Sequence, residues 1–429
     1  MRTSHAISFL LSILGCSVAC RPAPPDPRPA SMEDVRNHYR TQPRYLRPLP
    51  QTPVPEGLAD ISAATCGACH TEIYEEWKLS THSQAWLGDA QFLAELEKSE
   101  KQGVGWLCMN CHTPLENQLP RLVAGLRDDR LDRPVFVSNP GFDANLQKDA
   151  ITCATCHVKD GVVLGPYGDT KSPHPVAKSE ALLKPDVCTQ CHQAQARFDD
   201  LNLICVFNTG AEYDASPQAA EGQRCQSCHM PEVERTLWVG GTEVRKTRRH
   251  WFGGSLIPKQ PGLTDALAAL RPHYPPGLAV TPTAPPARLV AGAPAELTVR
   301  VENREAGHML PTGDPERFLL VRLIATGPGG ERLAERTERI GIEYQWYPEV
   351  KKLSDNRLQP REARDYGLTF TAPAKGPVKF RVEASRWRIS EENLRYHDLE
   401  EKYVPGQVFY EQDLEIPVGK ARSPAGRGG

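Results

Sequence analysis

The chain has 429 residues, enough for two or three domains that each bury a hydrophobic core. Its formal net charge is only -2, and acidic and basic residues are mixed along it. Because a balanced charge gives no overall field that would recruit DNA or RNA, we expect no nucleic-acid partner.

The first twenty residues have the features of a secretory signal. Arg2 precedes the apolar run AISFLLSIL, which is too short to span a bilayer as a mature helix, and small residues follow. The stretch GCSVACRP resembles the lipobox of bacterial lipoproteins, with Cys20 as the best candidate for the acylated cysteine and Cys16 as the second choice. An ordinary signal peptide is the alternative. We expect an exported protein, periplasmic or at the cell surface, anchored to a bacterial membrane by a lipid on Cys20.

Proline content and hydrophobic periodicity divide the rest of the chain. Residues 21–57 are dense in proline and are predicted to form a semi-rigid linker after the signal peptide of residues 1–20. Residues 58–257 have helical patterns in HTEIYEEWKLSTHSQAW and DAQFLAELEKSEKQ, few strand patterns and many loops. A second proline-rich linker is predicted at residues 258–286, and the tail at residues 419–429 is predicted to be disordered.

Residues 287–418 have a different pattern, in which apolar residues alternate with polar ones. The segments ELTVRVEN, RFLLVRLIATG, RDYGLTFTAP, PVKFRVEAS and GQVFYEQDLEIPV are predicted strands, with turn residues such as TGPGGE between them. Several short strands with polar outer faces indicate an immunoglobulin-like β-sandwich. The predicted fold class is α+β with two domains, a mainly helical, loop-rich domain followed by this sandwich.

Five Cys-x-x-Cys-His motifs lie within residues 58–257. They read CGACH, CMNCH, CATCH, CTQCH and CQSCH in chain order. The motif cysteines are Cys66, Cys69, Cys108, Cys111, Cys153, Cys156, Cys188, Cys191, Cys225 and Cys228, and the motif histidines are His70, His112, His157, His192 and His229.

This spacing suits the covalent attachment of haem. The two sulfurs lie about one helical turn apart, so each can form a thioether with one vinyl group, and the next histidine can ligate the iron. Zinc is the main alternative, but a zinc ribbon needs two Cys-x-x-Cys pairs and no histidine directly after each. A thioredoxin-like dithiol would need a βαβ setting, which the pattern lacks. The motifs therefore predict five covalently attached c-type haems.

Five haems would also explain how a region so poor in aliphatic runs can fold. Each porphyrin is a large flat apolar body, so the haems would form much of the core and pack close enough to exchange electrons. Outside the leader, Cys205 is the one cysteine that lies in no motif, and it is most simply a small buried apolar residue.

Histidines of the mature chain that lie outside the motifs are the candidates for the sixth iron ligand. They are His38, His82, His174, His250, His273, His308 and His397. His82 follows His70 by twelve residues in what looks like one helix, about 18 Å along its axis, so it would serve a neighbouring haem. His174 is a fair candidate, His273 is weaker, and His38 and His397 are interpreted as bystanders. Mostly bis-histidine, low-potential haems are expected, because the mature chain has few methionines.

Three segments carry a resemblance to a known family. CGACHTEIYEEWKLSTHSQAW resembles the opening module of multihaem cytochromes c of the cytochrome c-554 type. CQSCHMP followed by RRHWFGG resembles the last-haem segment of such chains, which implies that His250 is a distal ligand. VENREAGHMLPTGDP is similar to a Gly-His-x-x-Pro-Thr-Gly element of related cytochromes and implies the same role for His308; a histidine that only caps a loop is the alternative. The chain departs from the tetrahaem carrier of the cytochrome c-554 type, because it has five motifs and an added sandwich domain.

These features predict an electron relay that passes single electrons between redox partner proteins. The alternative is a multihaem oxidoreductase that reduces a small nitrogen or sulfur oxyanion at one haem with an open axial site, with RKTRR at residues 245–249 binding the anion. A third class, a docking module with passive haems, leaves the five cofactors without a use.

Overall fold

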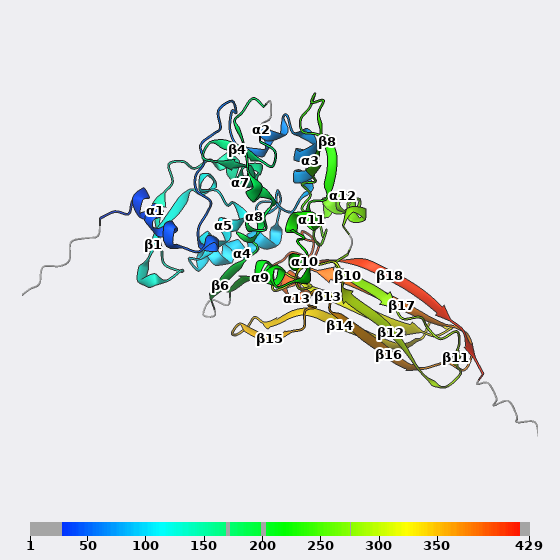
Figure 1. The fold of residues 1–429 in the computed structure, drawn as a ribbon. Helices are drawn as coiled ribbons and strands as arrows, with labels where there is room; N and C mark the ends of the chain where they lie inside the picture. The colour runs from blue at the N-terminus through cyan, green and yellow to red at the C-terminus, as the bar shows by residue number, and fades with distance from the viewer. Residues whose placement is uncertain (1–27, 169–171, 199–202, 275, 421–429) are drawn as a thin grey trace, which may run out of the picture.

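The computed structural model describes residues 28–168, 172–198, 203–274 and 276–420. The predicted signal peptide, Cys20 and most of the predicted tail lie outside these residues. Figure 1 shows two parts: short helices and strands gather in the N-terminal part, and long strands extend from it in the C-terminal part. No helix among the described residues is long and apolar enough to cross a membrane.

The N-terminal part consists of short helices joined by loops and small hairpins. Its helices are α1 (Met32–Thr41), α2 (Ala63–Gly67), α3 (Thr71–Leu79), α4 (Ala90–Lys101), α5 (Gly105–His112), α6 (Ala144–Gln147), α7 (Cys153–His157), α8 (Asp186–Thr189), α9 (Thr209–Asp214), α10 (Pro217–Ala220), α11 (Cys225–His229) and α12 (Thr264–Ala268). Its strands are β1 (Arg121–Leu126), β2 (Pro134–Ser138), β3 (Val158–Lys159), β4 (Val162–Gly165), β5 (Val176–Lys178), β6 (Ala194–Phe198), β7 (Leu203–Phe207), β8 (Glu232–Thr236) and β9 (Val244–Arg248).

The C-terminal part is built from long strands. They are β10 (Leu278–Pro282), β11 (Leu289–Val290), β12 (Pro294–Asn303), β13 (Phe318–Thr326), β14 (Arg332–Gln345), β15 (Lys351–Asp355), β16 (Ala363–Thr371), β17 (Val378–Trp387), β18 (Gly406–Ile416) and β19 (Val418–Gly419), with helix α13 (Glu391–Tyr396) between β17 and β18. One sheet has the order β10-β12-β16 and the other β15-β14-β13-β17-β18, with all neighbours antiparallel. The immunoglobulin-like type of this sandwich stays a prediction.

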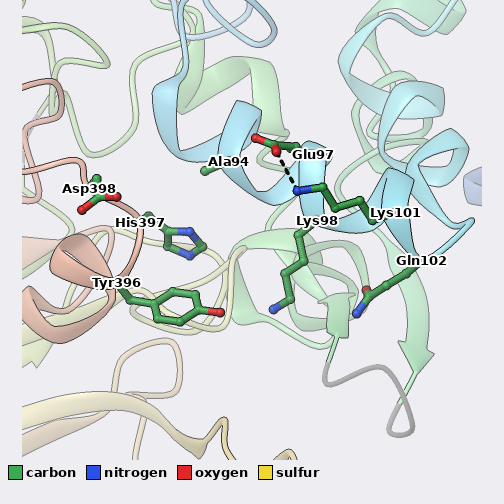
Figure 2. A pocket seen from close by; sticks show the side chains of 8 residues that line it. All are labelled: Ala94, Glu97, Lys98, Lys101, Gln102, Tyr396, His397 and Asp398. Atoms are coloured by element: carbon green, nitrogen blue, oxygen red, sulfur yellow. Dashed lines mark hydrogen bonds and ion pairs between the residues drawn. The ribbon is translucent and has the colours of Figure 1, made fainter.

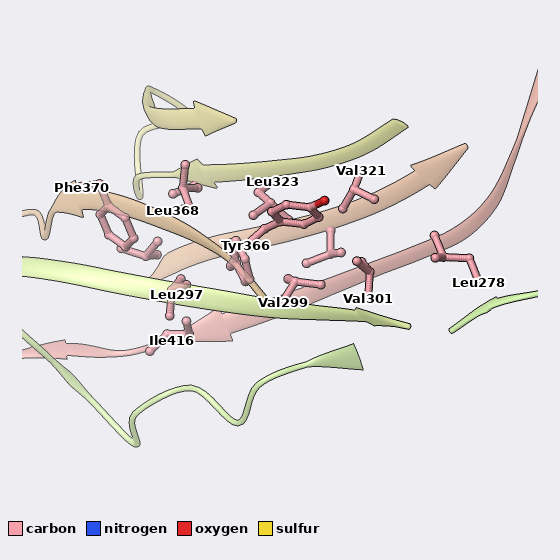
Figure 3. Packing of buried hydrophobic residues seen from close by; sticks show 14 of the residues in the cluster. Leu278, Leu297, Val299, Val301, Val321, Leu323, Tyr366, Leu368, Phe370 and Ile416 are labelled. Atoms are coloured by element: carbon pink, nitrogen blue, oxygen red, sulfur yellow. The ribbon is translucent and has the colours of Figure 1, made fainter. Parts of the chain in front are cut away.

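The core of the C-terminal part lies between its two sheets. Alternate residues of β12, among them Leu297, Val299 and Val301, point inward against Leu323 of β13 and Phe380 of β17. Figure 3 shows this packing. The five segments predicted as strands all form strands, because the period-two pattern is that of a sheet with one buried face.

The N-terminal part has no comparable core among the residues described. Its buried apolar residues form small separate clusters, such as Val35 with Leu122 and Ile61 with Leu146. Each of these clusters holds only four or five buried residues, far fewer than the core of the sandwich.

The extended spacer predicted for residues 21–57 is wrong over residues 32–41, which form helix α1. Ser31 starts the helix with a capping box, in which its hydroxyl accepts from the Asp34 N–H and its own N–H donates to the Asp34 carboxylate. Val35 and Tyr39, four residues apart, are buried against β1, and the Tyr39 hydroxyl accepts from the Val123 N–H at 2.9 Å. The sequence prediction missed this helix because its amphipathic pattern is short and lies in a segment rich in proline.

The proline-rich linker predicted at residues 258–286 is also partly folded. It contains helix α12, whose Leu267 is buried with Leu270 and Tyr274, and strand β10, which pairs with β12. The strands of the sandwich therefore begin at Leu278, ahead of the predicted start at residue 287.

The two parts are joined by polar contacts as well as by packing. Arg357 of the sandwich forms an ion pair of 2.7 Å with Glu212 of α9, and both side chains are largely buried. Thr312 donates to the same carboxylate at 2.6 Å, and Tyr403 donates to Gln91 of α4 at 2.9 Å. These contacts hold the end of the sandwich against α4 and α9.

Candidate haem-binding site

Each of the five motifs lies on its own short helical segment. The motifs at Cys153 and Cys225 coincide with α7 and α11, and α5 ends at His112. In the first and fourth motifs the helical turn continues past the assigned helix, with the His70 N–H donating to the Cys66 carbonyl at 3.0 Å and the His192 N–H to Cys188 at 3.1 Å. Residues i, i+3 and i+4 of a helix share one face, so both cysteines and the histidine of a motif can meet one planar cofactor.

Backbone carbonyls orient the rings of four motif histidines, His70, His112, His157 and His229. Nδ1 of His70 lies 2.6 Å from the Leu237 carbonyl, Nδ1 of His157 lies 2.9 Å from Leu164, and Nδ1 of His229 lies 2.6 Å from Gly253. Nδ1 of His112 bonds to the Ala85 carbonyl in the same way. A carbonyl accepts from a protonated Nδ1, which leaves Nε2 as the unprotonated nitrogen that can bind a metal.

Three motif histidines each face a second histidine from outside the motifs. The ring centroids are 6.1 Å apart for His157 and His250, 6.2 Å for His229 and His308, and 6.5 Å for His192 and His82. With metal–nitrogen bonds of about 2.0 Å, two imidazoles across one iron have centroids roughly 6 Å apart. The three pairs have the separation that bis-histidine ligation requires.

The facing histidines are held in the neutral form. Burial lowers the pKa of His82 and His250 to about 3 and that of His192 and His308 to about 4. A neutral imidazole is the ligating form. No group of three or more His, Cys, Asp or Glu side chains converges on a metal position in the part of the chain that the structure describes. Two histidines do suffice for iron when a porphyrin supplies the other four nitrogens, so the donor set fits haem.

His82 and the helix before it differ from the sequence prediction. Helix α3 ends at Leu79, and Ser80 starts a turn in which its hydroxyl accepts from the Ser83 N–H. The single helix expected from His70 through His82 is therefore wrong. His82 lies against His192 of the fourth motif, and its ring also contacts Phe252 at 4.3 Å.

His70 and His112 are the two motif histidines without a ring contact to another histidine among the residues described. His174 lies close enough to His70 for its pKa to be lowered by that neighbour in addition to burial, and its own Nδ1 is buried without a partner. His112 stacks on Phe92 at 3.7 Å with the rings almost parallel, and the charges nearest to it are Asp89 and Lys259. His174 is thus the sixth-ligand candidate for the first motif, and the described part of the chain offers no such histidine for the second motif.

Contacts between cysteines show which motifs are neighbours. Cys66 of the first motif is in hydrogen-bonding contact with Cys153 of the third, and Cys111 of the second with Cys191 of the fourth. Cys188 of the fourth motif contacts Cys225 of the fifth. The described cysteines are all free of disulfides. The motifs therefore form neighbouring pairs rather than isolated sites.

The basic run at residues 245–249 is occupied by ion pairs and backbone contacts. Lys246 pairs with Glu232 at 2.5 Å, and Arg248 donates to the carbonyls of Gln226 and Met230. Arg249 pairs with Glu72 at 2.6 Å. These partners make the run a poor anion-binding site, contrary to the role considered for it from sequence.

A buried ion pair supports His250 and was missed by the sequence analysis. Glu76 accepts from Arg235 at 2.7 Å, and both side chains are 4% exposed. The second oxygen of Glu76 accepts from the backbone N–H of His250 at 2.8 Å. The sequence shows Glu76 only as one of several acidic residues on a helix.

The remaining histidines lie away from the motif histidines. His273 contacts Trp251 at 5.0 Å, His38 contacts Tyr39, and Nε2 of His397 pairs with Glu95 at 2.9 Å. His397 borders a surface hollow of about 440 Å³ between α4 and the end of α13. Figure 2 shows Tyr396 and His397 on one side of this hollow and Lys98 and Gln102 on the other.

A buried carboxyl beside α4 gives the fold a pH dependence. Burial, and then the nearby Asp314 and Glu95, raise the pKa of Glu316 to about 8. The folded protein keeps this proton up to about pH 8, whereas the unfolded chain loses it near pH 4.5. Stability should therefore fall as pH rises from 4.5 to 8, by on the order of a few kcal/mol.

Urea unfolding of the wild type and of Glu316→Gln at pH 5 and pH 8 measures this dependence. We expect the variant to lose less stability than the wild type between the two pH values, because an amide has no proton to release. An equal loss in both proteins would mean that Glu316 does not titrate in this range.

Comparison with known proteins agrees with the site. A model of the family described as cytochrome c554 and c-prime matches residues 65–127. The chain is similar to a penta-heme cytochrome c552 from Thermochromatium tepidum, with a TM-score of 0.57 and 18% sequence identity over 84% of this chain and 100% of that chain. Together these matches support a multihaem c-type cytochrome.

The other comparisons add little. The CARDB domain of the PF1109 protein from Pyrococcus furiosus matches with a TM-score of 0.18 and 18% identity, over 33% of this chain and 87% of that chain. No curated protein matches the chain. The family match spans the first two motifs.

Proposed function

We propose that this protein is an exported five-haem cytochrome c that relays single electrons between redox partner proteins. Each bound haem would supply an iron that cycles between the ferric and ferrous states. The observation that carries the proposal is the set of three facing histidine pairs at 6.1 to 6.5 Å, each joining a motif to a histidine from elsewhere in the chain. An iron that keeps two protein ligands in both states changes its charge with little rearrangement.

The residues of the site perform three tasks in this relay. The motif cysteines anchor the haems, and the backbone carbonyls fix the imidazole planes. Phe92 and Phe252 pack against His112 and His82 and exclude water from their rings. The cysteine contacts place the first motif beside the third and the fourth beside both the second and the fifth, so electrons can pass through neighbouring cofactors.

Localisation and anchoring form part of the same proposal. The leader and the lipobox-like Cys20 support export to the periplasm or the cell surface and attachment to a bacterial membrane by a lipid. The donor and the acceptor are proposed to be proteins that approach the haem edges. Globomycin treatment of expressing cells tests the lipid, since the unprocessed precursor should accumulate; normal processing would contradict the anchor.

One observation favours reduction of a small nitrogen or sulfur oxyanion as the second candidate. His112 faces no second histidine in the part of the chain that the structure describes, so the iron of the second motif would keep a sixth position for a ligand. Asp89 and Lys259, the charged groups near His112, could move protons there.

Electron paramagnetic resonance and carbon monoxide binding test the relay against this alternative. The relay predicts low-spin signals for the paired haems and electron transfer through the array without turnover of nitrite, hydroxylamine or sulfite. Carbon monoxide uptake at one haem together with turnover of one of these substrates would favour the enzyme. Removal of Phe92 by Phe92→Ala should perturb only the second-motif haem, because its ring stacks on His112.

A further inference from the structure

The end of the sandwich that faces the N-terminal part carries a group of cations, of which Arg388 is buried and the others are partly buried. Arg317 directly precedes β13, Arg386 lies in β17 and Arg388 directly follows β17, so antiparallel pairing of these strands brings all three to one edge. Lys259, from the segment after β9, joins them. We call Lys259, Arg317, Arg386 and Arg388 the cation cluster.

The cations of the cluster lack enough carboxylates. Two carboxylates lie near the four cations: Asp89, which pairs with Lys259 and lies near Arg317 and Arg388, and Asp314, which lies near Arg317. No ion pair joins Arg317, Arg386 or Arg388 to a carboxylate in the described ranges of the chain. Burial raises the pKa of Asp314, which weakens it as a counter-charge.

Unsatisfied donors in the cluster point to a missing acceptor. Arg388 is 5% exposed; its Nη2 donates to the Ile257 carbonyl, but its Nε is buried without a partner. Nε of Arg386 is also buried without a partner, and Arg317 has one long bond of 3.4 Å to the Thr312 carbonyl. Buried guanidinium N–H groups without an acceptor are costly, and two carboxylates do not balance four cations, which points to a further anion at this site.

Two members of the cluster, Arg317 and Lys259, lie near histidines of the candidate haem sites. Arg317 lowers the pKa of His192 and of His308, after burial as the main cause, and Lys259 does the same to His112. Haem carries two carboxylate side chains on the edge away from its thioether bonds. Arginine binds carboxylates through paired N–H donors, which makes it the suitable residue for such a group.

We propose that the cation cluster of the sandwich binds the carboxylates of the haems anchored at the second and fourth motifs and thereby raises their reduction potentials. This inference rests on the proposed function, because it requires that these motifs hold haem. The sandwich is then part of the electron-transfer unit, supplying charge to two haems in addition to the candidate ligand His308. A positive charge beside a haem stabilises the reduced iron, since reduction adds negative charge.

The test uses the full-length, haem-loaded protein and the single variants Arg388→Gln and Arg317→Gln. Spectroelectrochemical titration should show at least one haem that becomes harder to reduce, with its ratio of reduced to oxidised protein at a fixed potential falling about tenfold. For a one-electron couple this is a shift of 59 mV. Unchanged potentials at full haem content in both variants would overturn the proposal.

Two further variants show whether a shift in reduction potential comes from the lost charge or from a change in the fold. Arg381→Gln is the matched control, because Arg381 lies on the same strand as Arg386 but pairs with Asp413 on an exposed face, and it should shift no potential. Arg388→Lys keeps the charge and should keep the potentials near those of the wild type, while altering the resonance Raman propionate bands because an ammonium cannot bind two oxygens as a guanidinium does. Unaltered bands in this variant would overturn the proposal even if the glutamine variants fail to load haem.

The same titration distinguishes the occupant. If added sulfate or phosphate shifts the wild-type potentials and Arg388→Gln abolishes that response, the cluster binds a free anion and the proposal is wrong. A wild-type protein that contains no haem at these motifs would instead contradict the proposed function. A failure of this proposal therefore shows in the response of the potentials to added anions, and a failure of the proposed function shows in the haem content.

Discussion

Replacing His308 with alanine should convert one haem from low spin to high spin and leave the others unchanged. The His308 ring faces that of His229 at 6.2 Å with an angle of 16° between them, and its Nδ1 lies 2.9 Å from the Met309 carbonyl, so Nε2 points toward the shared iron position. Alanine offers no ligand there, and the iron would become five-coordinate. Electron paramagnetic resonance of the oxidised protein and carbon monoxide binding to the reduced protein measure the change.

The control for this experiment is His397→Ala. His397 belongs to the same C-terminal part but pairs with Glu95 and faces no motif histidine among the residues described, so its removal should leave all haem spectra unchanged. If His308→Ala keeps the wild-type spin states, then His308 is not a ligand and only caps its loop. Because His308 lies between β12 and β13, a positive result would also show that the sandwich completes a haem site.

Replacing Glu76 with leucine should destabilise the protein by about 3 to 5 kcal/mol. The change removes the buried carboxylate of Arg235 and leaves only the half-exposed Glu72, 3.2 Å away, as its partner, and breaking one side of a buried ion pair has this effect. It also removes the acceptor of the His250 N–H. Urea unfolding followed by fluorescence and by haem absorbance measures the loss of stability.

Two further variants test whether the loss of stability in Glu76→Leu comes from the broken buried ion pair. Glu72→Gln changes a carboxylate that also contacts Arg235 and Arg249 but is 54% exposed, so it should cost less than about 1 kcal/mol. The double variant Glu76→Leu with Arg235→Leu should recover part of the loss, because no unpaired charge stays buried. A loss for Glu76→Leu no larger than that for Glu72→Gln would contradict the buried pair.

The anchoring residues could be predicted from sequence, but their partners could not. The Cys-x-x-Cys-His spacing is local, so it identifies His157 as a motif histidine without knowledge of the fold. That His157 faces His250, ninety-three positions later, depends on how β8 and β9 return the chain toward α7. The resemblance to known cytochromes suggested His250 and His308 as ligands, but it did not indicate which motif each one faces.

Strands could be predicted from the sequence where one face of the strand is buried. They could not be predicted where the strand is exposed and its side chains show no alternation. The alternation in β12 and β17 is strong because the two sheets bury one face of each. Strand β15 is exposed along its whole length and has no such pattern. Helix α1 and the role of Arg388 were not predicted for a related reason. The sequence does not show what packs against a short helix among prolines or around a single arginine.

The measurement that tests the central claim most directly is the intact mass of the purified protein together with its pyridine haemochrome content. The account predicts a mass that exceeds the processed polypeptide by five haems and five haems per chain by absorbance. Changing both cysteines of one motif, Cys153→Ser with Cys156→Ser, should reduce both values by one. A protein that matures without covalent haem, or that holds zinc at these motifs, would contradict the account.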